Sequence, residues 1–275
     1  MAGKALIVGC GDLGIRCARL LVDAGYQVTG ARRNSSVLPS WMQHLNVDIT
    51  QPDTLAAVQS TQWDLVIVAL STRGEEGYRQ VYIDGLSNLL KALPGKPFLL
   101  FVSSTSVYSQ TDGSWINETS PVEPTGFSGR RLLQAEQLLS ESGIAYSSLR
   151  MSGLYGGGRS NHLLTQLNNG HICPATPIKY SNRIHVDDAA RFIVHLADRH
   201  SAGKPVDSMY LVSDSLPVPL REVMEWLAEQ EAIDTASLVD DYLPQRGGHK
   251  RCDNTRMLAT GFSCLYGSYR EGFAV

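Results

Sequence analysis

The chain has 275 residues, of which 43% are hydrophobic, and its formal net charge at neutral pH is −3. Its length suits one large α/β domain or a domain and a half, and its hydrophobic content is typical of a globular protein. The small net charge gives no reason to expect nucleic acid or an anionic membrane as a partner. The apolar runs, such as residues 65–70, have the length of a strand, so we expect no membrane span.

Neither the amino terminus nor the cysteines indicate a secreted protein. Residues 1–4 lead directly into an apolar, strand-like run and show no signal-peptide pattern. The five cysteines are widely spaced and include no Cys-x-x-Cys pair, which argues against a disulfide framework or a zinc site. The seven histidines show no metal-ligand spacing either. The sequence therefore predicts a cytoplasmic protein with reduced thiols and no metal site.

Short apolar runs alternate with amphipathic segments through the first two-thirds of the chain. The predicted strands are residues 4–8, 27–31, 46–49, 65–70, 98–103, 147–151 and 209–212. Apolar stripes predict helices at residues 13–24, 81–90, 132–139, 187–198 and 220–230. This alternation predicts an α/β fold, a doubly wound parallel sheet of the Rossmann type.

The pattern changes after residue 152, where glycine and proline become frequent and strands become less clear. We expect residues 1–152 to form a dinucleotide-binding Rossmann domain and residues 153–275 to form a smaller substrate-binding region. About residues 185–213 of that region are expected to pack back onto the first domain. Because doubly wound folds bind ligands at the carboxyl edge of the sheet, the smaller region is expected to cover that edge.

A glycine-rich loop, Gly9-Cys10-Gly11-Asp12-Leu13-Gly14, connects the first predicted strand to the first predicted helix. In this context the Gly-x-Gly-x-x-Gly spacing indicates a dinucleotide site rather than a purely structural turn. Gly9 allows the tight turn, Gly11 lets the backbone approach a pyrophosphate, and Gly14 lets the helix pack against the strand. The free N–H groups at the start of the helix, at Asp12 and Leu13, favour the negative charge of that pyrophosphate.

Cofactor choice is expected to depend on the end of the second strand, where NAD-selective sites place a carboxylate for the ribose. This chain has Ala31-Arg32-Arg33-Asn34 there. Guanidinium groups pair bidentately with phosphate, so we expect NADP, held at its 2′-phosphate by Arg32 and Arg33, with NAD as the less favoured cofactor. A solvated basic turn is the alternative. Further cofactor contacts are expected after the third and fourth strands, at Asp48, Ile49, Ala69, Leu70 and Ser71.

Four later segments occur in a characteristic order. They are residues 82–90, the hydroxyl-rich strand end 103–108, the Leu-Arg-Met-Ser-Gly-Leu-Tyr-Gly segment 149–156, and the Arg-Ile-His-Val-Asp-Asp-Ala-Ala segment 183–190. With these segments, the chain from Lys4 to about Gly272 resembles the NAD-dependent epimerase/dehydratase branch of the extended short-chain dehydrogenase/reductase family. The resemblance implies a redox or epimerase active site at the end of the fifth strand.

The chain departs from that family at its catalytic base. The family carries Tyr-x-x-x-Lys at the start of the helix after the fifth strand, and residues 109–140 contain no such pair. One alignment places Ser128 and Leu132 at the Tyr and Lys positions, and another places Phe127 and Arg131 there. Because Val8 also replaces the first glycine of the family's loop, the chain is similar to an atypical subgroup that keeps the fold and largely lacks the catalytic residues.

The remaining candidates for catalysis are hydroxyl groups. The resemblance implies that Ser104 takes the place of the family's catalytic Ser/Thr and binds a substrate oxygen. Tyr108 and Tyr155 are the candidates for a relocated base, although a structural role explains either one. His185 is expected to make a structural hydrogen bond. Thr105 and Ser106 stand where sugar dehydratases carry an acid pair, which argues against dehydration.

Two functions from different classes therefore stay open. The first is an NADP-dependent oxidoreductase or epimerase with a relocated base, acting on a polar, sugar-like or nucleotide-linked alcohol. The second is a non-catalytic NADP-binding sensor or regulatory protein. The resemblance also implies a homodimer through the helices at residues 76–91 and 127–142. The expected partners are thus a small-molecule substrate and a second copy of the chain.

Overall fold

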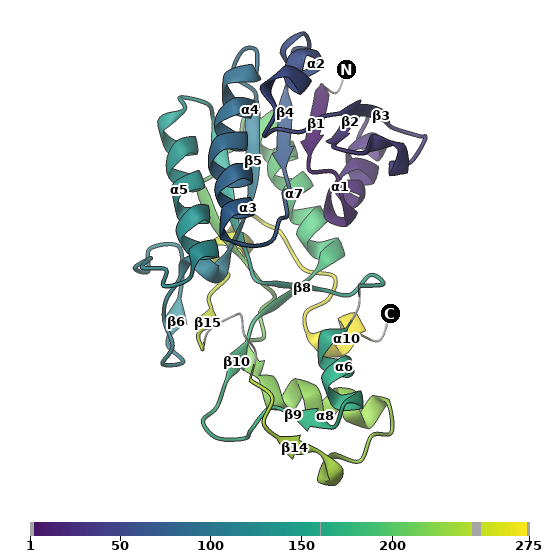
Figure 1. Ribbon diagram of the computed structural model, residues 1–275, viewed down its shortest axis with the longest axis vertical. Helices are drawn as coiled ribbons and strands as arrows, with labels where there is room; N and C mark the ends of the chain where they lie inside the picture. The colour runs from purple at the N-terminus through teal and green to yellow at the C-terminus, as the bar shows by residue number, and fades with distance from the viewer. Residues whose placement is uncertain (1–2, 160, 244–248, 274–275) are drawn as a thin grey trace. The chain divides into compact units, whose positions relative to one another are not determined.

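A computed structural model describes the whole chain except residues 1–2, 160, 244–248 and 274–275 (Figure 1). The chain divides into two compact units. The first unit comprises residues 1–107, 123–150 and 189–210, and the second comprises residues 108–122, 151–188 and 211–275. Residues 108–122, expected in the first domain, group with the second unit, whereas residues 189–210 group with the first unit.

The first unit is built on a seven-stranded sheet with the order β12-β7-β5-β4-β1-β2-β3. The pairings from β5 through β4, β1 and β2 to β3 are all parallel. The doubly wound α/β fold expected from the sequence is thereby confirmed. Its strands are β1 (Lys4–Val8), β2 (Gln27–Arg32), β3 (Gln43–Asn46), β4 (Leu65–Val68), β5 (Phe98–Ser104), β7 (Tyr146–Met151) and β12 (Met209–Val212).

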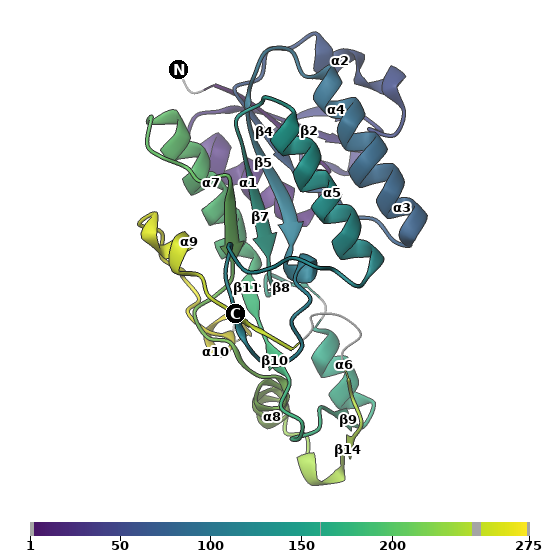
Figure 2. The same ribbon diagram turned by 90° about the vertical axis from the view of Figure 1, so that its left-hand side faces the viewer.

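Helices cover both faces of this sheet. In Figure 2 the helices α2 to α5 lie on one face, and α1 and α7 lie on the other. The helical segments are α1 (Asp12–Asp23), η1 (Ser35–Val37), η2 (Pro52–Leu55), α2 (Ala56–Gln59), α3 (Glu75–Arg79), η3 (Gln80–Gly85), α4 (Leu86–Ala92), η4 (Thr105–Val107), α5 (Phe127–Glu141) and α7 (Val186–Ser201). Every residue of β4 is buried, as expected for a central strand covered on both faces.

Two elements of the first unit differ from expectation. The third strand occupies residues 43–46 rather than 46–49, because β3 is an exposed edge strand, so it lacks the apolar run on which the prediction depended. The helix expected over residues 81–90 is interrupted by the π-helical segment η3. Gly85 lies at the end of this segment, where a Cβ would come within 2.7 Å of the Ile49 side chain.

The second unit consists of small elements. Four two-stranded sheets pair β10 with β13, β11 with β8, β14 with β9, and β15 with β6. Its apolar core includes Leu167, Ile172, Val223 and Met224, which are at most 1% exposed. The elements are β6 (Trp115–Ile116), β8 (Gly153–Tyr155), α6 (His162–Asn168), β9 (His171–Ile172), β10 (Tyr180–Ser181), β11 (Arg183–His185), β13 (Val218–Pro219), α8 (Leu220–Gln230), η5 (Thr235–Ser237), β14 (Val239–Asp240), β15 (Arg251–Cys252), α9 (Thr255–Ala259) and α10 (Tyr269–Phe273).

Within the described ranges, none of the helices combines the length and the apolar character that crossing a bilayer requires.

Candidate functional site

The glycine-rich loop between β1 and α1 is tightly packed against the protein at two of its three glycines. Gly9 has a φ of +77°, and a Cβ there would lie 2.6 Å from the carbonyl oxygen of Ala69. At Gly14 a Cβ would lie 3.0 Å from the Ile7 side chain. Gly9 therefore excludes a larger residue at the turn, whereas at Gly14 a side chain would require Ile7 to shift by a few tenths of an ångström.

Gly11 differs from the other two glycines of the loop. A Cβ there would meet only the carbonyl oxygen of Gly9, at 3.9 Å, so the space beside it is open. Gly11 is also the N-cap of α1, and no side chain caps this helix. Open space beside a glycine and an uncapped helix amino terminus are the features of a phosphate cradle. The loop therefore fits the pyrophosphate of a dinucleotide.

A cavity of about 390 Å³ adjoins this loop at the carboxyl ends of the first four strands. Eight of the twelve predicted cofactor residues line it: Gly9, Gly11, Arg32, Arg33, Asp48, Ile49, Leu70 and Ser71. The remaining four, Asp12, Leu13, Gly14 and Ala69, do not. Leu13 and Gly14 are buried, and Asp12 pairs with Arg16 at 2.9 Å.

Sequence reasoning missed one wall of this cavity. It is formed by the loop after β4 and the start of the following helix, through Thr72, Gly77, Gln80 and Val81. These residues belong to no recognisable motif, so only the folded chain identifies them. Asn34 and Thr50, which follow β2 and β3, also line the cavity, and their adjacency to predicted residues was the only signal for them.

The two arginines after β2 have different surroundings. Arg32 is half-buried and donates from Nη1 to the carbonyl oxygen of Cys10 at 3.4 Å. Arg33 is exposed, and its guanidinium pairs with no residue in the described part of the chain. Arg32 therefore braces the glycine-rich loop, whereas Arg33 presents an uncommitted cation to the cavity.

The loop after β3 is held in shape by its own hydrogen bonds. The Oδ1 atom of Asp48 accepts from the backbone N–H and the hydroxyl of Thr50, at 3.0 and 2.7 Å. Thr54 donates to the carbonyl oxygen of Asp48 at 2.8 Å, and Asn88 donates to that of Ile49 at 3.0 Å. Asp48 therefore has a local structural role in addition to its place in the cavity wall.

The hydroxyl motif at the end of β5 presents two serines in different environments. Ser103 is 3% exposed and donates to Oε1 of Glu136 at 2.6 Å. Glu136 in turn pairs with Arg150 at 2.7 Å, and both side chains are buried. Ser104 is half-buried, and its Oγ accepts from the N–H of Ser106 at 3.1 Å. The Ser104 hydroxyl therefore keeps its proton available for a ligand oxygen.

The start of α5 packs closely against the segment after β5 but supplies no base. A Cβ at Gly129 would overlap the carbonyl oxygen of Ser106, so glycine is required for this approach. The Phe127 ring packs edge-on against Tyr78 at 5.5 Å. Leu132 is buried, and Arg131 donates to Gln134 at 2.9 Å. Neither alignment of this helix therefore provides the Tyr and Lys pair.

The two tyrosine candidates belong to the second unit. The Tyr155 hydroxyl donates to the carbonyl oxygen of Ser268 at 3.0 Å, and burial raises the pKa of Tyr155. Both facts favour a protonated, structural phenol. Tyr108 is 4% exposed, and its carbonyl oxygen accepts from Nζ of the buried Lys250 at 3.3 Å. His185 is 1% exposed and accepts at Nδ1 from the N–H of Asp187 at 3.2 Å.

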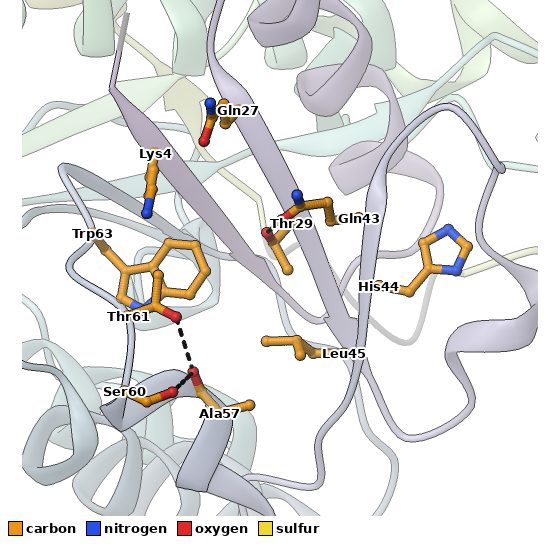
Figure 3. A pocket seen from close by; sticks show the side chains of 10 residues that line it. All are labelled: Lys4, Gln27, Thr29, Gln43, His44, Leu45, Ala57, Ser60, Thr61 and Trp63. Carbon is orange, nitrogen blue, oxygen red and sulfur yellow. Dashed lines mark hydrogen bonds between the residues drawn. The ribbon is translucent and has the colours of Figure 1, made fainter.

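A second hollow, of about 260 Å³, lies toward the amino ends of β1 and β2 (Figure 3). Lys4 and Gln27, at the starts of β1 and β2, line it together with Trp63. The hydroxyls of Ser60 and Thr61 both donate to the carbonyl oxygen of Ala57. Because doubly wound sheets bind dinucleotides at the carboxyl ends of their strands, this hollow does not have the position expected of a dinucleotide site.

The buried carboxyl of Asp214, in the second unit, is expected to make the stability of the folded protein depend on pH. This residue is 2% exposed, and burial raises the pKa of its carboxyl to about 7, although Arg183 acts in the opposite direction. The folded protein therefore binds more protons than the unfolded chain between about pH 4 and pH 7. The stabilising contribution of this group is lost as the pH rises through that window.

We expect the unfolding free energy of the wild-type protein to fall between about pH 5 and pH 8. The fall should be larger than that of Asp214→Asn by on the order of 3 kcal/mol. Urea unfolding at the two pH values measures this difference. Asp53→Asn, at an exposed aspartate of the first unit, serves as the control and should keep the wild-type dependence. An equal loss in wild type and Asp214→Asn would contradict the prediction.

Comparisons with known proteins agree with this architecture. Residues 5–211 match the model of the NAD dependent epimerase/dehydratase family. Protein YeeZ of Escherichia coli (strain K12) is 32% identical over 168 residues, which are 57% of this chain and 60% of YeeZ. The match therefore spans less than two thirds of the length of this curated relative.

Solved structures extend the likeness to the whole chain. A protein of Methylobacillus flagellatus, described as an NAD-dependent epimerase/dehydratase, is 36% identical with a TM-score of 0.83, over 100% of this chain and 97% of that one. UDP-glucose 4-epimerase of Thermotoga maritima, solved with UDP-glucose, is 17% identical with a TM-score of 0.77. The Thermus thermophilus enzyme, solved with NAD, is 18% identical with a TM-score of 0.78. Each epimerase match covers 98% of this chain and 96% of the epimerase, and both show the shared fold.

Proposed function

Because this chain belongs to the NAD dependent epimerase/dehydratase family, we propose that it is an NADP-binding oxidoreductase or epimerase with an atypical active site. Its substrate in this proposal is a polar, sugar-like or nucleotide-linked alcohol. The observation that carries the proposal is the cavity at the carboxyl ends of the strands, where the open space at Gly11 and the unpaired guanidinium of Arg33 meet in the part of the chain that the structure describes. The phosphates of a dinucleotide would supply negative charge opposite the guanidinium of Arg33 and the amino terminus of α1.

The residues present fit the dinucleotide in separate parts. The N–H groups at the start of α1 and the space beside Gly11 would hold the pyrophosphate. The loop containing Asp48 and Ile49 would hold the adenosine end, and Arg33 would hold a 2′-phosphate. When bound, the nicotinamide of such a cofactor supplies a hydride acceptor or donor. The protein's part is then to orient the substrate and to manage a proton.

Ser104 is the protein group best suited to a substrate oxygen. Its hydroxyl ends β5 and keeps its proton for donation. The proton-transfer role is harder to assign, since Phe127 carries no proton and an unactivated serine at position 128 is a weak base. The contact of Tyr155 with Ser268 also argues against Tyr155. Tyr108 is 4% exposed and belongs to the second unit, so this proposal assigns no proton-transfer residue beside Ser104.

The proposal predicts that Ser104→Ala lowers turnover without weakening the binding of NADPH. We expect kcat to fall by about a hundredfold, since removing one positioned hydrogen-bond donor to a developing oxyanion costs about that much. The measurement is cofactor oxidation or reduction with a panel of alcohols and nucleotide sugars that begins with UDP-glucose. Ser104→Thr, which keeps the hydroxyl, is the matched control and should retain most of the activity. Unchanged turnover in Ser104→Ala would overturn the catalytic role.

A non-catalytic NADP sensor is the second candidate function. The observation that favours it is the start of α5, where Phe127 packs against Tyr78 and no base is present. In that case NADPH binds, no substrate of the panel changes the cofactor, and Ser104→Ala behaves as wild type. Tight NADPH binding is thus common to both functions, and turnover distinguishes them.

A further inference from the structure

Arg183, in β11 of the second unit, is a buried cation without an acceptor. The residue is 7% exposed. In the chain as described, no side chain or carbonyl group accepts a hydrogen bond from its guanidinium, and no carboxylate lies within ion-pair distance of it. The Arg183 carbonyl oxygen accepts from the N–H of Asp214 at 2.7 Å and from Ser213 Oγ at 3.1 Å. A guanidinium has five N–H donors, so its hydrogen-bonding capacity is entirely unused.

The surroundings of Arg183 offset its charge from a distance and accept no hydrogen bond from it among the described residues. The guanidinium lies 5.9 Å from the centre of the Tyr269 ring. Burial lowers the pKa of Arg183 to about 10, although the charge of Asp214 acts in the opposite direction, so the side chain stays charged near neutral pH. The nearby Asp214 carboxyl accepts instead from the N–H of Leu216 at 3.2 Å. A mostly buried guanidinium that donates no hydrogen bond to the described residues is costly, and an acceptor supplied by a ligand would stabilise it.

The nitrogens of Arg183 are not sealed from solvent. Some side-chain atoms, such as Gln110 Oε1 and Ser152 Oγ, have neither solvent contact nor a hydrogen-bond partner. The nitrogens of Arg183 do not belong to this group. Since these nitrogens also make no hydrogen bond, each one must keep some contact with solvent. The side chain is therefore mostly buried, and its donor end keeps a limited contact with solvent. An anion that replaced this solvent would gain charge-assisted hydrogen bonds.

We propose that Arg183 binds the carboxylate of a small-molecule ligand in the second unit. A single guanidinium neutralises a monoanion bidentately. A phosphate monoester carries about −1.5 to −2 charges near neutral pH and would leave excess negative charge beside the acidic groups Asp214 and Asp188, which interact with each other. A carboxylate adds less negative charge beside these groups than a phosphate monoester does, so we assign a carboxylate to this position. Naming that ligand as the substrate rests on the proposed function, whereas the binding site itself does not.

The test compares anions that differ in charge and size. NADPH-saturated protein, in which the dinucleotide cavity is filled, is titrated calorimetrically with acetate, glucuronate, glucose and inorganic phosphate. We expect both carboxylates to bind more tightly than glucose or phosphate. In Arg183→Met we expect carboxylate affinity to fall by about tenfold or more, since hydrogen bonds to charged groups are worth about 1.5–3 kcal/mol.

Arg270→Met is the matched control. Arg270 also lies over the Tyr269 ring, at 4.7 Å, but it is paired with Glu222 at 2.9 Å, so its loss should change carboxylate affinity by less than about twofold. Arg183→Met replaces the buried cation by an apolar side chain, and urea unfolding checks that this variant is folded.

Three outcomes overturn the inference. They are carboxylate affinities that are the same in wild type and Arg183→Met, the absence of carboxylate binding to wild type, and a preference for phosphate over both carboxylates. Failure of NADPH to bind would instead count against the proposed function, and the same titrations would then be carried out without cofactor. The two proposals are therefore separable.

Discussion

NADPH is expected to bind more tightly than NADH, and Arg33→Ala is expected to remove most of the difference. The guanidinium of Arg33 is exposed at the cavity and uncommitted within the described structure, so a 2′-phosphate would gain its hydrogen bonds without breaking others. Hydrogen bonds to charged groups contribute about 1.5–3 kcal/mol, which corresponds to a preference of roughly tenfold to a hundredfold. Fluorescence titration of both cofactors, at one fixed salt concentration, measures this preference.

Variants of the neighbouring arginines sharpen this test. Arg32→Ala is expected to weaken NADPH and NADH alike, because Arg32 braces the glycine-rich loop through the carbonyl oxygen of Cys10. Arg19 lies 4.2 Å from the centre of the Trp41 ring and does not line the cavity. Arg19→Ala should therefore leave both affinities unchanged. Equal binding of the two cofactors by wild-type protein would refute NADP selectivity and would favour NAD.

Breaking the buried ion pair beneath the hydroxyl motif is expected to destabilise the first unit strongly. Glu136 accepts from both Arg150 and Ser103, and all three residues are at most 5% exposed. Removing one partner leaves an uncompensated buried charge, which typically costs about 3–5 kcal/mol. We expect a loss of that size in Glu136→Leu, measured by urea unfolding.

The double variant distinguishes the charge from the packing. Glu136→Leu combined with Arg150→Met removes both charges, and we expect it to recover a large part of the lost stability, because apolar replacements of a buried ion pair are often neutral. Glu225→Gln, at the partly exposed pair of Glu225 with Arg221, is the surface control and should cost less than about 1 kcal/mol. If the double variant is no more stable than Glu136→Leu, the loss of stability comes from the lost packing of the pair and not from an uncompensated charge.

The pair also connects stability to the site. Ser103, which donates to Glu136, directly precedes Ser104 at the end of β5. Side chains alternate between faces along a strand, so the core contact of Ser103 sets the direction in which Ser104 points. Loss of the ion pair is therefore expected to disturb Ser104 even in variants that still fold.

Local patterns in the sequence were sufficient to predict the fold class. The Gly-x-Gly-x-x-Gly loop, the apolar strands and the helical stripes are short-range features, and each depends only on residues close together in the chain. The prediction of the third strand was wrong because it also relied on a local apolar pattern. At the exposed edge of the sheet, β3 is determined by its pairing with β2 and not by an apolar pattern of its own.

Residue identity and spacing were also enough to predict the family, which the family comparison confirms, and to show that residues 109–140 contain no Tyr-x-x-x-Lys pair. The folded chain was needed to separate Arg33 from Arg32, to bring the Tyr155 hydroxyl to Ser268, 113 positions further along the chain, and to leave the buried guanidinium of Arg183 without an acceptor among the described residues. These features depend on hydrogen-bond partners and burial, which are set by groups that are distant in sequence. A charged or hydroxyl residue acquires its role only when the fold decides which of those groups it meets.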